Sequence, residues 1–294
     1  GTYPPLNLAL LAAIAEKDGH ETEIIDAEVL RMPVEVLVDI VIRKSPDIIA
    51  LTGMSPFFHL SKQVAEILRA NAYKGKIIIG GQHVTIMKEQ IFDSVFDYGF
   101  VGDGEEGLPA FLKALEKKDD FQTVPGLIYR DGENVLKNKQ KPCNKNLDIY
   151  PLAARHLLPM DKYRLGTMKG RLPFTSIETL RGCPWKCIFC ASDALETTRI
   201  TKRSMKSVVD EIESVVTRYG VRHFMIIDDV LTLVRKRSVE FCEEILKRKL
   251  AITFEGNTRA NLVDDQIMEL MAEAGLIRLS FGLETVDDDM RKTM

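Results

Sequence analysis

The chain has 294 residues, of which 45% are hydrophobic and 28% are charged, and its formal net charge is −3. These values allow a sizeable core and two domains of ordinary size, and they give no electrostatic case for a nucleic-acid partner. No apolar run is long enough for a membrane span, and no signal-peptide pattern is visible. The expected location is therefore the cytoplasm, with the cysteines kept reduced.

The first half of the sequence alternates short apolar strands with longer helices. Strands are predicted at 21–26, 47–52, 76–79 and 98–101, and helices at 6–17, 34–43, 58–70, 87–94 and 108–117. This alternation is typical of a doubly wound parallel sheet of the Rossmann or flavodoxin-like type. Ligands of such sheets bind beyond the carboxyl ends of the strands.

Three loops are expected at that edge of the sheet, namely residues 52–55, 80–83 and 102–105. They are rich in glycine and other small residues, which lets a flat ligand approach the backbone. The alternative is that these glycines only make tight turns. Residues 1–118 are interpreted as one α/β domain that opens in a loop, as though a first strand were missing.

The segment 119–173 changes character and is interpreted as a linker. It contains a hairpin that is predicted to turn at Asp131-Gly132. Several prolines and a basic, polar stretch follow the hairpin, and the lysines of this stretch are interpreted as a solvated face.

Three cysteines in a C-x3-C-x2-C pattern follow the apolar segment 174–180, which is predicted to be a strand: Cys183, Cys187 and Cys190. Thiolates so close together suit a metal centre. A structural zinc site requires four closed ligands, whereas an iron–sulfur cluster held by three cysteines leaves one iron open to another ligand. Cys143 stands alone in a loop, and Cys242 is expected to face a helix core. An iron–sulfur cluster is therefore favoured over zinc, and an odd number of cysteines disfavours disulfides.

The rest of the chain repeats strand and helix with a period of about thirty residues, which predicts a parallel barrel. Further strands are predicted at 223–227, 252–259 and 276–284, and helices at 203–212, 237–249 and 264–274. Chemistry in such barrels takes place at the carboxyl ends of the strands. The polar residues expected there are Asp228, Asp229, Asn257, Arg259 and Glu284. Each also has a structural interpretation, such as a helix cap or a charge pair, and His223 is expected to be structural.

The C-x3-C-x2-C motif, with the aromatic Phe189 just before its third cysteine, resembles the cysteine motif of the radical S-adenosylmethionine (SAM) superfamily. The resemblance implies that Cys183, Cys187 and Cys190 hold a [4Fe-4S] cluster. The open iron of this cluster would bind SAM, and its electron would cleave SAM to methionine and a 5′-deoxyadenosyl radical. It also implies an electron donor such as flavodoxin or ferredoxin, and a (β/α)6 barrel of which residues 174–294 would be a part that lacks the last strands.

The polar strand ends resemble the D-D, N-x-R and G-x-E strand ends of that family. With Phe189, they are the SAM-binding residues that the resemblance implies: Phe189, Asp228, Asp229, Asn257, Arg259 and Glu284. The acidic residues would lie near the methionine amine of SAM, and the others near its carboxylate and ribose.

The first domain resembles the cobalamin-binding domain of B12-dependent radical SAM enzymes. The likeness rests on Pro4-Pro5-Leu6, on Gly80-Gly81-Gln82-His83 and on residues 102–106. It implies a cobalamin site made by Pro4, Leu6, Thr52, Met54, Ser55, Gly80, Gly81, His83, Gly102, Gly104 and Glu105. The D-x-H-x-x-G motif of domains that ligate cobalt through histidine is absent, which leaves the lower cobalt ligand open.

The resemblance implies an enzyme that carries out cobalamin-dependent methyl transfer to a small organic substrate, or a radical cyclisation of it. Two alternatives remain. One is a radical SAM enzyme with a vestigial first domain that binds no cobalamin, and the other is a non-catalytic zinc or cobalamin-sensing module. A methylthiotransferase is disfavoured, because the N-terminal domain of that family carries three further cluster cysteines and no cysteine precedes Cys143 here.

Overall fold

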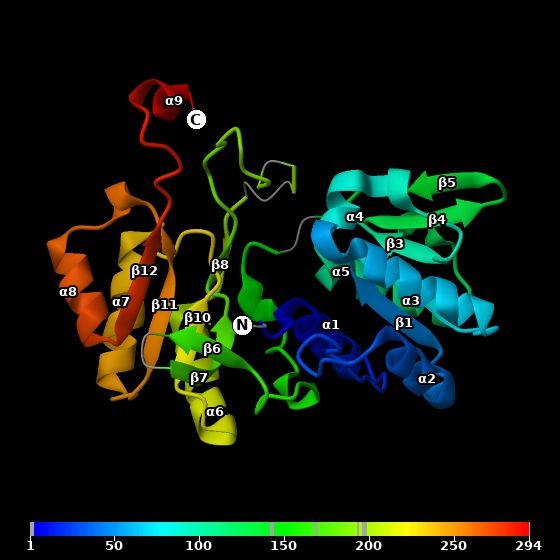
Figure 1. The fold of residues 1–294 in the computed structure, drawn as a ribbon, viewed down its shortest axis with the longest axis horizontal. Coiled ribbons are helices and arrows are strands. Elements are labelled where there is room, and N and C mark those ends of the chain that lie inside the picture. The colour runs from blue at the N-terminus through cyan, green and yellow to red at the C-terminus, as the bar shows by residue number, and fades with distance from the viewer. Residues whose placement is uncertain (1–2, 142–143, 168–169, 193, 196–198, 294) are drawn as a thin grey trace. The chain divides into compact units, whose positions relative to one another are not determined.

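The computed structural model describes residues 3–141, 144–167, 170–192, 194–195 and 199–293. The chain divides into two compact units, one of residues 7–143 and the other of residues 1–6 together with 144–294. Each unit is built on one five-stranded sheet, so the predicted α/β class is confirmed (Figure 1). Among the helices of the described ranges, none combines the length and the apolar character that a bilayer span requires.

The sheet of the first unit has the strand order β1-β2-β3-β4-β5. Its parallel strands are β1 (Ile48–Thr52), β2 (Lys76–Gly80) and β3 (Tyr98–Phe100). The predicted hairpin is present as β4 (Leu127–Asp131) and β5 (Asn134–Lys137), and β4 pairs antiparallel with β3. Leu127 and Ile128 are fully buried, so this part of the expected linker completes the first sheet.

Helices cover both faces of this sheet, as a doubly wound fold requires. Ile77 and Ile79 of β2 pack with residues of α2 (Val34–Lys44) and α3 (Phe58–Ala70). The intervening Ile78 packs on the opposite face with residues of α1 (Leu6–Lys17) and α5 (Gly104–Lys117). Because successive side chains of a strand point to opposite faces, one apolar strand contributes to two cores.

Three expectations for this unit are wrong. Residues 21–26 form no strand, because a strand requires a hydrogen-bonded neighbour and, in the described part of the chain, β1 pairs with β2 alone. The helix expected at 87–94 begins earlier, as α4 (Gln82–Met87), and is followed by a 3-10 turn (Lys88–Ile91). α5 begins at Gly104 and not at residue 108, since tertiary packing outweighs the low helix propensity of Gly104 and Pro109.

The sheet of the second unit has the strand order β12-β11-β10-β7-β6. The four parallel strands that the sequence predicts are present: β7 (Gly170–Ile177), β10 (His223–Ile226), β11 (Thr253–Thr258) and β12 (Leu276–Phe281). β6 (Arg164–Thr167) pairs antiparallel with β7. A separate two-stranded ladder joins β8 (Leu180–Arg181) and β9 (Thr201–Lys202). Further 3-10 turns lie at Ser55–Phe57, Phe121–Thr123, Leu147–Ile149, Arg155–Leu157 and Ala260–Leu262.

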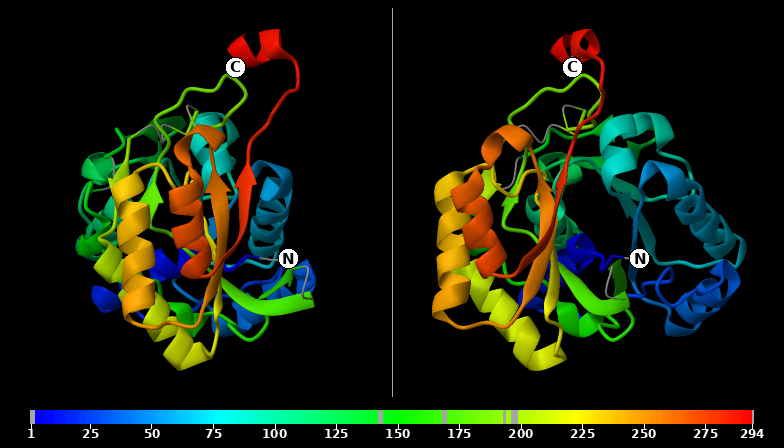
Figure 2. Two further views of the ribbon diagram at one scale, coloured as in Figure 1. Left: turned by 90° about the vertical axis from the view of Figure 1, so that its left-hand side faces the viewer. Right: turned by 60° about the vertical axis from the view of Figure 1, so that its left-hand side comes forward.

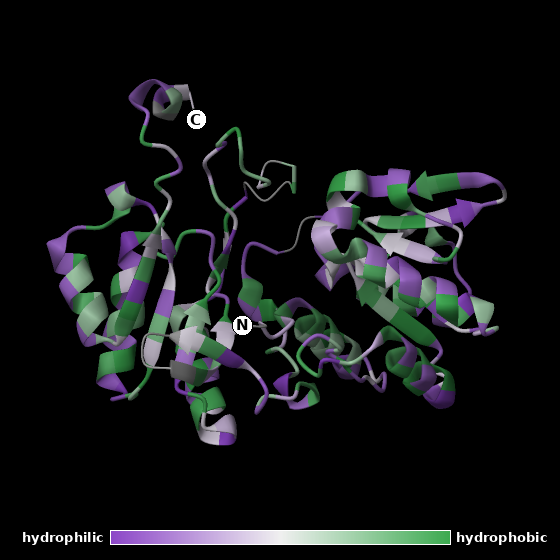
Figure 3. Cartoon of the chain, in the orientation of Figure 1, coloured by the Kyte–Doolittle hydropathy of each residue, from purple (hydrophilic) through white to green (hydrophobic). Residues whose placement is uncertain are grey.

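Three helices cover one face of this curled sheet: α6 (Met205–Tyr219), α7 (Arg235–Lys247) and α8 (Asp265–Glu273) (Figure 2). A short helix, α9 (Asp288–Thr293), follows β12. Apolar and polar residues alternate along α7 and α8 (Figure 3). Ser204 caps α6, where its Oγ accepts a hydrogen bond from the Ser207 amide at 3.2 Å.

A buried group of charges ties the segment ahead of β7 to this unit. The guanidinium of Arg155 donates to Glu211 Oε1 from Nε (3.0 Å) and Nη2 (2.7 Å) and to Thr175 Oγ1 (2.6 Å). Arg203 Nη1 donates to the other oxygen of Glu211 at 2.5 Å. Burial alone would raise the pKa of Glu211, but the two guanidiniums bring it below the ordinary value. Glu211 of α6 is therefore held as a carboxylate between two cations.

Candidate functional site

The three motif cysteines lie in the segment that follows β8, here called the cysteine loop (residues 182–190). Their thiols are free, those of Cys183 and Cys187 half-buried and that of Cys190 exposed. The Cys190 amide donates to the Cys187 carbonyl at 2.9 Å, which closes one turn between the last two cysteines. The loop leaves the carboxyl edge of the sheet, where the chemistry of parallel barrels takes place.

The chemistry of these donors fits an iron–sulfur cluster. Three thiols in one short loop are the donors that such clusters require. Within the described ranges, no three His, Cys, Asp or Glu side chains are already arranged as a metal site, so the fit rests on donor type and not on a preformed geometry.

Among the described residues, Cys242 does not supply a fourth ligand. Cys143 lies outside the described residues. Cys242 is buried in α7, as predicted, where burial raises the pKa of its thiol to about 12. A thiol of that pKa remains protonated at neutral pH and is a poor metal ligand.

Two of the predicted SAM-binding residues contact the cysteine loop. Arg259, which follows β11, lies over the indole ring of Trp185 with its Cζ 4.6 Å from the ring centroid. Its Nη1 donates to Cys187 Sγ at 3.6 Å. Asp229 is exposed after β10, and the nearby Gly182 amide favours the ionised form of its carboxyl group. Burial of its carboxyl oxygens, and to a lesser degree the charge of Glu178, raise the pKa of Asp229.

Asp228 faces the interior of the unit. It is 1% exposed, and its carboxylate accepts hydrogen bonds from the Thr179 amide (2.7 Å), the Thr179 hydroxyl (2.5 Å) and the Leu180 amide (3.2 Å). Burial raises the pKa of Asp228 to about 7, although these hydrogen bonds oppose the rise. Asp228 is thus not a helix cap, which was one structural interpretation of the acidic pair, but a buried acceptor for the backbone after β7.

The remaining predicted SAM contacts lie exposed at the same edge. Asn257 is near the end of β11, Glu284 follows β12 with φ +59°, and Phe189 is 50% exposed within the cysteine loop. Within the described ranges, neither Asn257 nor Glu284 hydrogen-bonds to the cysteine loop. His223, by contrast, is buried at the amino end of β10, between Thr253 Oγ1 (2.8 Å) and Glu255 Oε1 (3.1 Å). It therefore lies at the opposite end of the strand from the cysteine loop.

In the first unit, hydrogen bonds join the three predicted loops into one surface. The Gly53 amide donates to the Gly80 carbonyl at 2.9 Å, and the His83 amide donates to the Gly53 carbonyl at 3.0 Å. Thr85 connects the loop of residues 80–83 to the loop of residues 102–105, because its hydroxyl donates to the Gly81 carbonyl (3.0 Å) and accepts from the Gly102 amide (3.0 Å). The structure thus brings the three loops together, as expected for one edge of a parallel sheet.

Glycine is required at position 81 by both conformation and space. Gly81 has φ +101°, a value that other residues rarely adopt. A Cβ atom there would lie 2.8 Å from Thr52 Oγ1 and 2.9 Å from the Gly53 carbonyl oxygen. The positive φ and the close approach of two loops therefore require glycine at position 81. Both requirements are structural, as in the interpretation that these glycines make tight turns.

The other predicted cobalamin contacts differ in their accessibility. His83 lies in the first turn of α4, where its Nδ1 is 3.0 Å from Ser55 Oγ and its ring packs against Phe58 at 4.6 Å between centroids. Met54 is half-exposed, whereas Glu105 is buried in the first turn of α5. Pro4 and Leu6 belong to the second unit and not to the unit of these loops.

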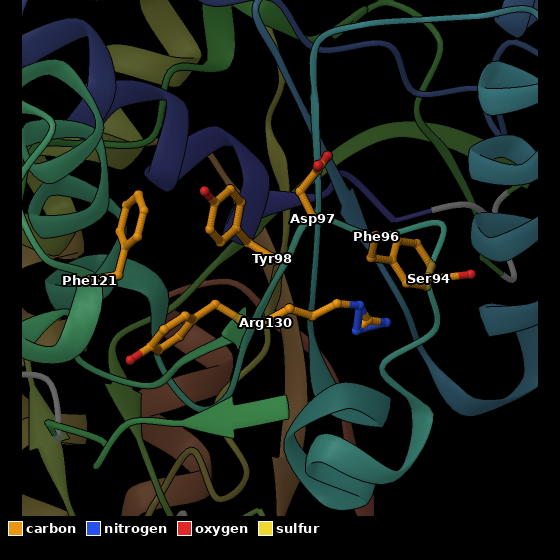
Figure 4. A pocket seen from close by; sticks show the side chains of 7 residues that line it. Ser94, Phe96, Asp97, Tyr98, Phe121 and Arg130 are labelled. Carbon is orange, nitrogen blue, oxygen red and sulfur yellow. The ribbon is translucent and has the colours of Figure 1, made fainter. Parts of the chain in front are cut away.

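A cavity in the first unit lies at the opposite end of the sheet from the three loops. It is lined by Ser94, Phe96, Asp97, Tyr98, Phe121, Tyr129 and Arg130 (Figure 4). Tyr98 is the first residue of β3. Two charged side chains that line the cavity already have partners, since Asp97 pairs with Arg69 and Arg130 donates to the Phe92 carbonyl at 3.0 Å. We therefore exclude this cavity from the candidate site.

The fold and these two edges define a class of protein that joins a corrinoid-type α/β domain to a radical SAM barrel, and sequence comparison agrees. Residues 1–112 match the family of the B12 binding domain, and residues 177–294 match the radical SAM superfamily. The chain therefore belongs to the radical SAM proteins that carry a B12-binding domain, as the sequence motifs predicted.

Its relatives include an uncharacterised methyltransferase of Pyrococcus horikoshii, with 29% identity over 97% of this chain and 61% of that protein. Another is the anaerobic magnesium-protoporphyrin IX monomethyl ester cyclase of Rubrivivax gelatinosus, with 30% identity over 97% of this chain and 52% of that protein. The chain thus spans about half to three fifths of the length of these relatives.

Solved structures share the fold. The radical SAM methyltransferase TsrM of Kitasatospora setae has a TM-score of 0.82 and 21% identity, over 98% of this chain and 58% of that one. The cobalamin-dependent radical SAM enzyme OxsB has a TM-score of 0.83 and 20% identity, over 99% of this chain and 43% of that one. At these identities the likeness establishes the architecture.

The sequence motifs did not indicate roles for Trp185, Thr179 or Arg237. Trp185 stands inside the cysteine motif, and Arg259 was predicted at a strand end of the same edge. An aromatic ring and a cation expected at one edge are the only sequence signal for the contact between Trp185 and Arg259. Thr179 and Arg237 carry no such signal, because their partners come from distant segments: Thr179 bonds to Asp228, and Arg237 donates to the carbonyls of Thr179 and Arg203.

Proposed function

We propose that this protein is a radical SAM enzyme in which Cys183, Cys187 and Cys190 hold a [4Fe-4S] cluster. The observation that carries the proposal is the set of three free thiols in one loop at the carboxyl edge of a parallel half-barrel. When bound, such a cluster supplies the electron that cleaves SAM. The protein then has to bind SAM beside the loop and to keep water away from the reaction.

The charged residues beside the loop suit the two charges of the methionine part of SAM. Asp229 offers a carboxylate for the ammonium group, and Arg259 offers a guanidinium for the carboxylate. Arg259 already lies against Trp185 and Cys187, so its position is defined before any ligand binds. Phe189, Asn257 and Glu284 are exposed at the same edge and complete the proposed SAM site.

We further propose that the three loops of the first unit bind cobalamin. A structure of OxsB contains aqua-cobalamin, and one of TsrM contains cobalamin and a [4Fe-4S] cluster. In this chain, Met54, Ser55, Gly81, His83 and Gly102 line the joined loops. Glu105 is buried, so its role in the proposal is to hold the first turn of α5 rather than to touch the corrin.

The proposed reaction is methyl transfer to a small organic substrate, or radical ring closure of it. The names of the relatives, which include methyltransferases and a cyclase, support both reactions. An electron donor such as flavodoxin or ferredoxin would be the protein partner, and the cytoplasm would be the compartment. Because the chain spans about half the length of those relatives, binding of the cofactors is tested before turnover.

The test is to produce the protein without oxygen in the presence of hydroxocobalamin, desalt it, and measure iron, sulfide, zinc and corrin per chain. The matched control is the triple variant Cys183→Ala/Cys187→Ala/Cys190→Ala. We expect iron and sulfide in the wild type, at least a tenfold loss of iron in the control, and corrin in both proteins. SAM binding is then measured by calorimetry on the iron-loaded protein.

Each other outcome selects an alternative. Iron and sulfide without corrin would indicate a first domain that does not use cobalamin. Zinc in place of iron, with no SAM cleavage after reduction by dithionite, would indicate the non-catalytic module. A control variant that retains its iron would contradict the assignment of the cluster to these three cysteines.

A further inference from the structure

Hydrogen bonds to several distant residues hold the segment immediately before the cysteine loop. We call residues 178–181 the junction segment. At its centre, Thr179 is 4% exposed. Its amide and its hydroxyl both donate to Asp228, and its carbonyl accepts from the Arg203 amide (3.0 Å) and from Arg237 Nη2 (2.9 Å). Every polar group of Thr179 therefore has a partner.

The partners come from several elements of the second unit. Asp228 follows β10, and it also accepts from the Leu180 amide at 3.2 Å. Arg237 reaches the junction segment from α7 and donates to the Arg203 carbonyl at 2.6 Å. Burial lowers the pKa of Arg237, and the nearby charge of Asp228 opposes this effect. The carboxylate and the guanidinium thus hold the amide and the carbonyl sides of the same residue.

Within the described ranges, the Gly182 amide lies close to Asp229, and the other side-chain contacts of the cysteine loop come after Cys183, where Arg259 meets Trp185 and Cys187. Arg181 pairs with Glu178 through two hydrogen bonds of 3.0 and 2.9 Å, and only Arg181 and Gly182 separate Leu180 from Cys183. Beyond Cys183 the side chains become accessible, with Ile188 74% exposed. The position at which the loop starts is therefore set mainly by the junction segment.

We propose that Asp228 is a positioning residue for the cluster: it fixes the junction segment, so that Cys183 enters the loop at a defined place, and it does not contact SAM. The proposal deepens the proposed function, since it rests on Cys183 being a cluster ligand. It assigns different roles to two adjacent aspartates. Asp228 acts inward on the backbone, and Asp229 acts outward toward the ligand.

This role has a specific chemical consequence. The two backbone amides need an acceptor oxygen, and the carboxamide of asparagine supplies one with nearly the same shape. An alanine supplies none and leaves both buried amides without a partner. A residue that bound the SAM ammonium by its charge would lose that function in both variants. Asp228→Asn and Asp228→Ala therefore distinguish positioning from direct ligand binding.

The experiment compares wild type, Asp228→Ala, Asp228→Asn and, as the neighbouring control, Asp229→Asn. Amide hydrogen exchange of a peptide spanning residues 177–184 is measured by mass spectrometry on the protein without its cofactors, and iron content and SAM affinity are measured after reconstitution. In Asp228→Ala we expect exchange at Thr179 and Leu180 to rise about tenfold or more, with reduced iron. We expect Asp228→Asn to stay within about threefold of wild type in both properties.

Asp229→Asn should leave the exchange of the Thr179 and Leu180 amides unchanged while SAM binding weakens; in the same peptide, only the Gly182 amide lies beside Asp229. Wild-type exchange in Asp228→Ala would overturn the proposal. So would an equal loss of SAM affinity in both Asp228 variants with the junction segment still protected. If the wild type binds no iron, the proposed function fails, but the exchange measurement still decides whether Asp228 holds the junction segment.

Should Asp228→Ala not fold, Thr179 provides a second pair of variants. Thr179→Val removes only the hydroxyl donor and leaves one carboxylate oxygen of Asp228 buried without it, whereas Thr179→Ser retains the donor. We expect faster exchange of the peptide in Thr179→Val and wild-type exchange in Thr179→Ser. Equal exchange in the two variants would contradict the proposal.

Discussion

The carboxyl edges of the two sheets are the candidate ligand-binding surfaces of their units, and they are made of different kinds of groups. In the first unit the edge is made of backbone and small side chains, where hydrogen bonds join the loop of Gly53 to Gly80 and, through Thr85, join Gly81 to Gly102. In the second unit the edge is made of thiols and charged side chains, supported from beneath by buried acidic side chains, Asp228 and Glu211. A backbone surface suits a large, rigid ligand, whereas paired charges suit a small ligand with two charges of its own.

The largest effect on this contrast should come from removing a buried ion of the second unit. Arg155→Met leaves the Glu211 carboxylate with one cation in place of two, and a buried pair that loses one partner typically costs about 3–5 kcal/mol. The free energy of unfolding by urea is the measurement. The matched control is Arg155→Met/Glu211→Met, which removes both charges and should recover much of the loss. Equal instability of the single and double variants would contradict the charge argument.

The corresponding change in the first unit is Gly81→Ala. Both the positive φ and the contacts below 3 Å with Thr52 and Gly53 oppose a Cβ atom, and we expect a loss of roughly 1–3 kcal/mol in stability together with weaker corrin binding. Gly132→Ala is the control, because Gly132 also has a positive φ (+59°) but nothing lies within 4 Å of its added Cβ. If the two variants bind corrin equally, the packing of the loops does not shape the cobalamin surface.

A third comparison concerns the dependence of stability on pH. Because burial raises the pKa of Asp228 from 3.8 to about 7, the native protein keeps this proton to higher pH than the unfolded chain does. Relative to Asp228→Asn, the wild type should therefore be most stable near pH 4 and lose stability as the pH rises to about 7, by at most about 1.4 kcal/mol per pH unit. Urea unfolding of both proteins at several pH values measures this difference. A constant difference would show that Asp228 is ionised throughout.

Periodicity and spacing predicted most of the fold because they report directly on burial. The apolar positions of α6 and the continuous apolar run of β2 fix helix and strand without reference to neighbours. The segment 21–26 shows the limit of this reasoning. Its pattern suits a strand, but strand formation depends on a partner that the pattern does not contain.

In the candidate site, too, the features set by local sequence were predictable and those set by distant partners were not. The cysteine spacing indicated the candidate cluster ligands Cys183, Cys187 and Cys190, because these three residues are close together in sequence. The direction in which Asp228 points was not predictable, because it depends on donors some fifty residues away at Thr179 and Leu180. Adjacent residues after a strand can face inward or outward, and only the tertiary structure decides which of them meets the ligand.

The hairpin of the first unit offers a practical attachment point. β4 runs antiparallel to β3, so the turn at Asp131-Gly132 lies at the amino ends of the parallel strands, away from the three joined loops. The space around Gly132 is open, and exposed turns of this kind accept insertions well. A fluorescent label or a purification tag inserted there would leave the proposed corrin surface accessible, so cofactor uptake could be followed optically in a protein immobilised through this turn.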